Sequence, residues 1–169
     1  MLSERLNVAL NAEVGLEFFA YTQYIAMAGF FESRSLDGLA QFFYDQAEEE
    51  KLHGLKIVKY IHETDSTLEI PAIPQPQNSF ASAEELAQTF LAQERHVTDQ
   101  FSAMMKMAVE DSDFMSQSFL QWFIDEQREE VSTARKMLDI IRMAGNNLLM
   151  VEMMIERIAP AGQQAGAAN

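Results

Sequence analysis

The chain has 169 residues, with 12 Lys and Arg against 26 Asp and Glu and a formal net charge of -14. This length suits one domain, and a 48% share of hydrophobic residues can form a core, which excludes a disordered acidic tail. The sequence contains no Cys, which excludes disulfide scaffolds, thiol catalysis and zinc sites built on Cys. Its acidity argues against nucleic acid as a partner, because phosphates are bound chiefly by Lys and Arg.

Apolar runs in this sequence are only a few residues long, whereas a membrane-spanning helix needs about 20 residues. Residues 1–6 carry Glu4 and lack the apolar core of a secretory signal. We therefore expect a cytoplasmic protein with no membrane partner.

Proline placement and apolar periodicity predict long helices. Proline is absent between residues 4 and 66 and again between residues 77 and 159. Because proline costs about 3 kcal/mol inside a helix, both stretches permit helices. Within them, four series of positions advance in alternating steps of three and four, which is the period of one helix face. The series are Leu6, Leu10, Glu13, Glu17, Ala20, Tyr24, Met27 and Phe31; Leu39, Phe43, Gln46, Glu50, His53, Ile57 and Tyr60; Ala87, Phe90, Glu94, Val97, Phe101, Met104 and Ala108; and Leu120, Phe123, Gln127, Glu130, Ala134, Met137 and Ile141.

Residues that cap helices mark where these helices begin and end. A side-chain oxygen at such a position can accept a hydrogen bond from a free backbone N–H of the first turn. The candidates are Ser35 or Asp37 for the second helix, Ser82 with Glu85 for the third, and Ser112 or Asp113 for the fourth. Gly145 predicts the end of the fourth helix, and a shorter apolar segment at about 146–158 predicts a fifth.

The lengths of the connections predict the topology. Short links join the first helix to the second and the third to the fourth, so each pair should be antiparallel. The middle connection, at about 67–82, is long and contains three of the four prolines, so it can run the length of a helix. The predicted fold is all-α: a four-helix bundle with one long crossover connection and a short fifth C-terminal helix. It would form one domain, residues 1–158, followed by a flexible tail, residues 159–169.

Polar residues interrupt every apolar series near its middle. They are Glu17 in the first helix, Glu50 and His53 in the second, Glu94 in the third, and Gln127 and Glu130 in the fourth. In a side-by-side bundle these residues meet at one level of the interior. An isolated buried carboxylate costs several kcal/mol, so such a cluster must be protonated, hydrated or bound to cations. Two divalent ions would balance the four carboxylates.

The donor set indicates which metals suit the cluster. Oxygen-rich ligands with few imidazoles favour Fe or Mn over Cu(I) or structural Zn. Glu50-Lys51-Leu52-His53 matches the Glu-x-x-His motif of di-iron bundles, whereas the corresponding stretch of the fourth helix, Gln127-Arg128-Glu129-Glu130, lacks the imidazole. A single Glu on an apolar helix face commonly means that the inward face has been assigned wrongly. A Glu near the middle of each of the four predicted helices instead favours a two-metal site. A di-metal oxidase or oxygenase acting on an organic substrate and a structural bundle without iron are the alternatives.

With these residues in place, the chain resembles the non-haem ferritins of bacteria and archaea over about residues 1–158. The resemblance is carried by Leu16-Glu17 followed by Tyr24, by residues 47–53, and by residues 119–123 continuing into 126–130. It implies a ferroxidase centre in which Glu17, Glu50 and His53 hold a first iron. Glu50 would bridge to a second iron held by Glu94 and Glu130, with Gln127 close by.

The resemblance also implies further site residues. A third, weaker iron site would use Glu49, Glu126 and Glu129, with Glu130 shared. Tyr24 would lie beside the centre and could supply an electron.

The activity and assembly of the family follow from the same resemblance. It implies oxidation of Fe2+ by oxygen or hydrogen peroxide and storage of the product as a ferric oxyhydroxide, inside a homo-oligomeric cage of 24 subunits. Haem is not expected. Bacterioferritins carry a second Glu-x-x-His, which fails here at Glu130, and a haem-ligating Met where this chain has Lys51. The Met-rich fifth segment departs from the family pattern.

Overall fold

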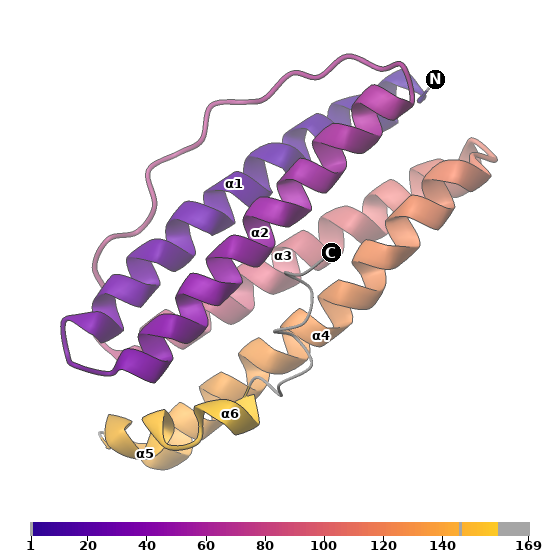
Figure 1. Ribbon diagram of the computed structural model, residues 1–169. Helices are drawn as coiled ribbons and strands as arrows, with labels where there is room; N and C mark the ends of the chain where they lie inside the picture. The colour runs from indigo at the N-terminus through magenta and orange to yellow at the C-terminus, as the bar shows by residue number, and fades with distance from the viewer. Residues whose placement is uncertain (1, 146, 159–169) are drawn as a thin grey trace.

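The computed structural model describes residues 2–145 and 147–158, which are helical apart from the connections. Four long helices, α1 (Glu4–Glu32), α2 (Asp37–Glu63), α3 (Ala83–Glu110) and α4 (Phe114–Ala144), lie side by side (Figure 1). Helices α1 and α2 form one antiparallel hairpin, and α3 and α4 form a second. The predicted all-α bundle is confirmed.

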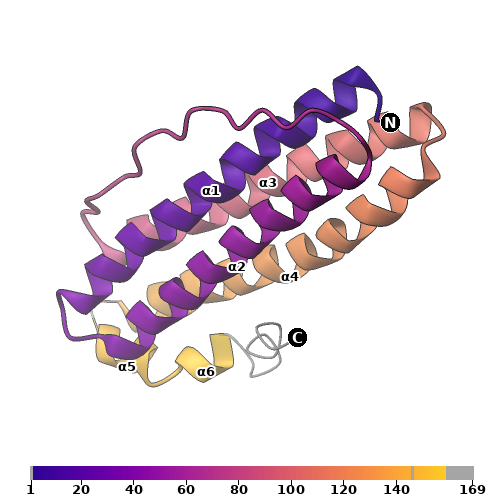
Figure 2. The ribbon, with the colours of Figure 1, turned by 45° about the horizontal axis from the view of Figure 1, so that its top comes forward.

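A crossover connection, residues 64–82, follows the length of α1 on its outer side (Figures 1 and 2). Two amide side chains of α1 hold it, each through a pair of hydrogen bonds. Asn11 donates to the carbonyl of Thr67 at 2.9 Å and accepts from the N–H of Glu69 at 2.6 Å. Gln23 donates to the carbonyl of Gln77 at 3.0 Å and accepts from its N–H at 2.8 Å. The crossover makes α2 and α3 parallel, as the sequence predicts.

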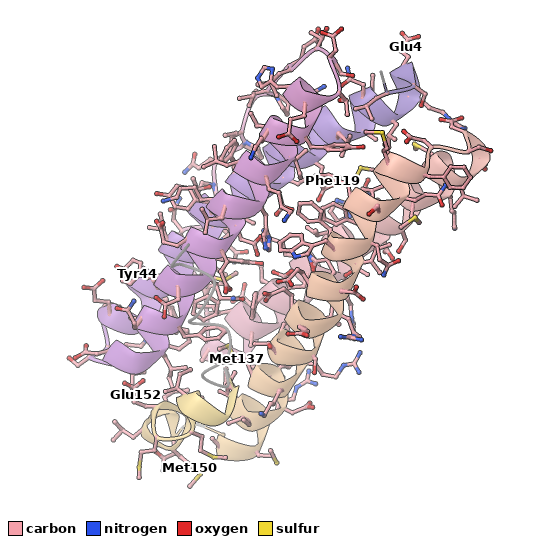
Figure 3. The ribbon with its side chains drawn as sticks, turned by 45° about the vertical axis from the view of Figure 1, so that its right-hand side comes forward. Glu4, Tyr44, Phe119, Met137, Met150 and Glu152 are labelled. Carbon is pink, nitrogen blue, oxygen red and sulfur yellow. The ribbon has the colours of Figure 1, made fainter. Side chains whose placement is uncertain are left out.

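Every position of the four predicted series is buried, so the periodicity identified the inward face of each helix. The apolar core forms two clusters separated along the bundle. One contains Tyr24, Phe43 and Met137, and the other contains Leu10 and Phe101. Figure 3 labels Met137 in the first cluster and Phe119, which packs against the second. Six buried polar side chains fall between the two clusters along the helices: Glu17, Glu50, His53, Glu94, Gln127 and Glu130.

Two of the predicted N-terminal caps and the predicted end of α4 are confirmed. Ser82 accepts the backbone N–H of Glu85 at 3.1 Å, and Asp113 accepts that of Ser116 at 3.0 Å. Gly145 ends α4 with a φ of 59°, a left-handed conformation that glycine adopts without a Cβ penalty.

The predicted cap of α2 is wrong. Neither Ser35 nor Asp37 caps this helix: Ser35 has a φ of 57°, outside the extended region that N-cap residues adopt, and Asp37 is the first helical residue. Instead, the carboxylate of Glu152 accepts the backbone N–H groups of Gly38 at 2.6 Å and Leu39 at 2.9 Å. The C-terminal segment therefore supplies the cap from a distant part of the chain.

That C-terminal segment forms two short helices, α5 (Leu148–Glu152) and α6 (Ile155–Ile158), instead of one continuous fifth helix. Both pack against the ends of α2 and α4, and Figure 3 labels Glu152 and Met150 there. The predicted tail, residues 159–169, lies outside the described residues. Within the described residues, none of the helices combines the length and the apolar character needed to cross a bilayer.

Candidate metal centre

Three of the predicted ligands converge between α1 and α2. Glu17, Glu50 and His53 each offer one ligand atom, and these atoms lie within 4.8 Å of one another. All three side chains are buried. Gly54 permits the approach of α1, because a Cβ at this position would lie 3.3 Å from Phe18 Cε1 and 3.4 Å from Glu17 Cβ. The glycine beside the histidine therefore lets Glu17 and Phe18 of α1 pack directly against the backbone of α2.

The imidazole of His53 is oriented by a carboxylate of its own helix. Nδ1 of His53 lies 3.0 Å from Oε2 of Glu50, one turn earlier on α2. Burial lowers the pKa of His53, but the hydrogen bond and charge of Glu50 and the charges of Glu49 and Glu126 outweigh that effect, so the pKa is raised overall. The acidic surroundings thus favour positive charge at this point, whether a proton or a metal ion.

The other hairpin contributes a second group of buried polar side chains. Glu94 on α3 and Gln127 and Glu130 on α4 are all buried, and Gln127 Nε2 lies 3.4 Å from Glu94 Oε2. Glu94 also accepts a hydrogen bond from the hydroxyl of Tyr24. Among the described residues, Glu17, Glu50 and His53 form the single group of three His or acidic side chains whose ligand atoms lie within 4.8 Å of one another, so the oxygens of Glu50, Glu94 and Glu130 do not all approach to that distance.

Without a cation, ionisation of these carboxyl groups is strongly disfavoured. Burial is the first cause that raises the pKa values of Glu17, Glu94 and Glu130 well above the ordinary value. The charge of Glu50 is the next cause for Glu17 and Glu94, and the charge of Glu94 is the next for Glu130. Both carboxylate oxygens of Glu17 and Oε2 of Glu130 are buried without a hydrogen-bond donor. Bound cations would satisfy these oxygens and neutralise the charge.

The residues predicted for a third site are less enclosed. Glu49 and Glu126 are half-buried, whereas Glu129 is exposed and lies 3.6 Å from the guanidinium of Arg128. Burial raises the pKa of Glu49 to about 7, although its carboxylate accepts a hydrogen bond from Gln46 and lies near His53. Within the described part of the chain these acids do not form a compact group of three ligand atoms. A metal there would need side chains to move or water to complete its coordination.

Two buried polar residues near the centre were not singled out from the sequence. Glu13, one turn before Glu17 on α1, is 1% exposed, and Gln46 is the buried donor to Glu49. Both positions belong to the predicted inward series, so the periodicity contained the signal. Both lie about one helical turn before a residue that the sequence predicts as a ligand, Glu13 before Glu17 and Gln46 before Glu50.

Aromatic rings border both halves of the centre. Tyr24 packs edge-to-face against Phe43 and Phe90, which encloses its hydroxyl beside Glu94. On the other side, Trp122 meets the ring of His53 edge-on, with 5.5 Å between the ring centroids, and Lys56 Nζ lies 3.6 Å above the indole. These contacts restrict the movement of His53 and Tyr24.

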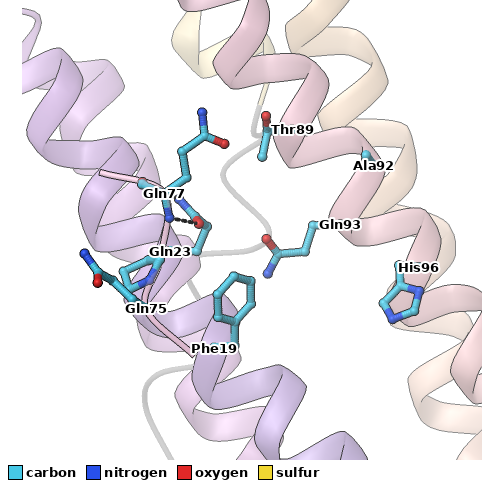
Figure 4. Close-up of a pocket in the computed structure, with 9 residues that line it drawn as sticks. Phe19, Gln23, Gln75, Gln77, Thr89, Ala92, Gln93 and His96 are labelled. Atoms are coloured by element: carbon cyan, nitrogen blue, oxygen red, sulfur yellow. Dashed lines mark hydrogen bonds between the residues drawn. The ribbon is translucent and has the colours of Figure 1, made fainter. Parts of the chain in front are cut away.

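A separate cavity of about 690 Å³ lies between α1, α3 and the crossover (Figure 4). Its lining includes Gln23, Gln77, Gln93 and His96, and the dashed line in the figure is the hydrogen bond from Gln77 to Gln23. No carboxylate lines it, so this cavity is distinct from the acidic centre.

Comparisons with known proteins agree with this geometry. The family model described as a ferritin-like domain matches residues 7–144. The chain is 40% identical to the bacterial non-heme ferritin of Staphylococcus epidermidis over 147 residues, which cover 87% of this chain and 89% of that protein. It is 35% identical to ferritin BfrB of Mycobacterium tuberculosis over 164 residues, 95% of this chain and 91% of the relative. Among solved structures, an open pore ferritin from Archaeoglobus fulgidus aligns with a TM-score of 0.87 and 25% identity, covering 94% of this chain and 98% of that one.

Proposed function

This chain belongs to the family of ferritin-like domains, and from that premise we propose that residues 1–158 form a ferritin domain that oxidises Fe2+ and stores the ferric product. One observation carries the proposal. Four carboxyl groups from four different helices are buried at one level of the bundle, and several of their oxygens have no donor. Such a cluster is costly unless cations occupy it.

We assign the two irons to the two halves of the centre. The first binds Glu17, Glu50 and His53, whose ligand atoms already lie within 4.8 Å of one another. Glu50 bridges to the second iron, which binds Glu94 and Glu130, with Gln127 beside it. Two Fe2+ ions then balance four carboxylates. With a single imidazole in the set, the ligands are mostly hard oxygens, which suit iron.

The oxidation changes this charge balance. Two Fe2+ give one electron each to a dioxygen molecule, which takes up two protons and leaves as hydrogen peroxide. With peroxide as the oxidant, the same two electrons and two protons yield two waters. The two ferric ions exceed the carboxylate charge by two, and water restores the balance by supplying oxide or hydroxide and releasing protons. The ferric iron then leaves the centre and is stored as the hydrolysed product, a ferric oxyhydroxide.

Storage requires an enclosed volume, so we propose that copies of the chain assemble into a homo-oligomeric cage, of 24 subunits as the family resemblance implies. Exposed apolar side chains support assembly, since Phe114, Met115, Met143 and Met153 are each more than two-thirds exposed in the single chain. The cytoplasmic location, the third iron site and the absence of haem stay predictions from the sequence.

Stopped-flow absorbance of the metal-free protein, mixed aerobically with increasing Fe2+, tests the proposal. We expect a fast phase that saturates at about two Fe2+ per chain, as a two-metal site requires, followed by slower growth of a broad ferric absorbance. Saturation without the slow growth would instead favour a di-metal oxidase. Absence of the fast phase would leave a structural bundle.

The Glu17→Ala variant tests the site assignment, and we expect it to lose the fast phase. Glu48→Ala is the matched control, because Glu48 is an exposed acid of α2 that pairs with Lys51. Circular dichroism checks that both variants keep their helices. A fast phase of unchanged rate in Glu17→Ala would overturn the assignment.

A further inference from the structure

Glu13 is a fifth acid buried in the bundle, and the proposed di-iron centre does not use it. Its side chain is 1% exposed, and Oε1 has no hydrogen-bond donor. None of the ion pairs in the described part of the chain involves it. A buried carboxyl group without a partner costs several kcal/mol and requires an explanation.

The position of Glu13 directs it toward the centre. It lies four residues before Glu17 on α1, so the two side chains are neighbours on one helix face. Burial raises the pKa of Glu13 to about 8, with the charge of Glu50 as the second cause. The charge of Glu13 in turn raises the pKa values of Glu17 and Glu94. Its carboxyl group is therefore within electrostatic reach of ligands from α1, α2 and α3.

We propose that Glu13 and Glu17 together hold a further metal ion, on the α1 side of the di-iron pair. Side chains at this helical spacing have Cβ atoms about 5–6 Å apart, which one cation between two carboxylates can bridge. All the protein donors are oxygens, so a hard divalent ion such as Fe2+ or Mn2+ fits the position. The inference rests on the proposed function, because Glu17 is shared with the first iron.

This position differs from the third site that the family resemblance implies. That site would draw on Glu49 of α2 and on Glu126 and Glu129 of α4, two of which are only half-buried and one exposed. Glu13 belongs to α1 and is fully enclosed. Glu13 is not part of the group of three side chains whose ligand atoms lie within 4.8 Å of one another. An ion bound between Glu13 and Glu17 would therefore lie beside that group.

The negative charge of an ionised Glu13 suggests what a metal ion between Glu13 and Glu17 would do. With two Fe2+ bound, an ionised Glu13 leaves the centre with one net negative charge, which attracts a third cation. Because Glu17 is common to both positions, an ion can pass to the first iron position by releasing Glu13 and gaining Glu50 and His53 while Glu17 stays bound. The position therefore supplies iron to the centre.

Anaerobic crystals of the metal-free protein soaked in Mn2+ test the inference, with anomalous scattering to locate the ions. We expect a manganese ion within about 2.5 Å of carboxylate oxygens of both Glu13 and Glu17. The Glu13→Gln variant, which keeps the side-chain shape, should lose this ion and keep the one at Glu50 and His53. Glu49→Gln is the matched control and should keep the ion at Glu13.

Solution measurements give a second readout. In a Mn2+ titration, Glu13→Gln should bind one class of manganese ion at least tenfold more weakly than the unmodified protein. In stopped-flow oxidation, the fast phase of this variant should still saturate at about two Fe2+ per chain. At low Fe2+ that phase should be several-fold slower. Manganese at Glu50 and His53 but not at Glu13 in the unmodified protein would overturn this inference and leave the proposed function intact. Manganese at neither place would overturn both.

Discussion

The hydroxyl of Tyr24 donates a hydrogen bond to Oε1 of Glu94, and this bond joins α1 to α3 inside the bundle. Burial, followed by the charge of Glu94, raises the pKa of Tyr24 well above its ordinary value, so the proton stays on the phenol. The bond fixes one oxygen of Glu94 and leaves Oε2 directed to its other neighbour, Gln127. Tyr24 therefore positions a carboxylate of the proposed second iron site.

Tyr24→Phe removes this donor. A hydrogen bond to a charged group contributes about 1.5–3 kcal/mol, so we expect affinity for the second metal ion to fall about tenfold or more. Anaerobic Mn2+ titration measures the affinity, and stopped-flow absorbance measures the rate of Fe2+ oxidation. Tyr21→Phe, on the same helix, is the control, because no hydrogen bond of the Tyr21 hydroxyl is found in the described structure. Equal affinities in both variants would contradict the positioning role.

Gly15 of α1 lies directly beneath the ring of Pro71 in the crossover, and a Cβ at this position would overlap that ring. We expect Gly15→Ala to displace the crossover and to lower the free energy of unfolding by about 1–3 kcal/mol. Gly29→Ala is a matched control on the same helix, because its Cβ would meet nothing within 4 Å. Since alanine favours helices, that variant should be stabilised by up to about 1 kcal/mol. Thermal unfolding that shifts equally in both variants would disprove the close contact.

Glu152 links α5 to the start of α2 by accepting two backbone N–H groups. Glu152→Ala should destabilise the chain by about 1–2 kcal/mol, the cost of losing a helix cap. Hydrogen exchange should become faster at the amides of Gly38 and Leu39 before it changes elsewhere. Glu63→Ala, at the exposed far end of α2, is the comparison. Unaltered exchange at those two amides would show that the cap is dispensable.

The stability of the metal-free protein should depend on pH in a direction opposite to that of acid denaturation. The pKa of Glu13 is raised to about 8, and burial raises those of Glu17, Glu94 and Glu130 well above the ordinary value. In the pH range between the unfolded and folded pKa values the folded state binds more protons, so stability is greatest at low pH and falls as pH rises.

We therefore expect the melting temperature of the metal-free chain to decrease between about pH 5 and pH 8. Mn2+ should reverse the trend, because ligand carboxylates must lose protons before they bind metal. Calorimetry with and without Mn2+ measures both slopes. A metal-free melting temperature that rises over this range would contradict the buried, protonated acids.

The inward face of each helix could be predicted because it is a local property. A buried stripe requires side chains at a repeat of 3.6 residues, and every position of the four series, polar ones included, is buried. The cap of α2 could not be found in this way. Its acceptor, Glu152, is separated from Gly38 by 114 positions, and no local pattern connects them.

The metal centre, like the fold, could be predicted only in part from the sequence. The sequence placed Glu17, Glu50 and His53 on facing stripes, which is sufficient to bring them together. The enclosure of the other acids depends on the axial level and rotation of each helix, which periodicity does not define. Glu129 is consequently exposed, whereas Glu13, outside the middle of its helix, is buried.

The division of the bundle into two hairpins has a consequence for how the chain folds. Each hairpin has a short connection, so its contacts are close in sequence and can form early, before the crossover brings the halves together. One hairpin carries Glu17, Glu50 and His53, and the other carries Glu94 and Glu130. Docking therefore brings like charges together, and it proceeds only as protons or metal ions neutralise them. Because protons alone can neutralise these acids, the two hairpins can dock before iron arrives, and metal ions then replace protons in a core that is already formed.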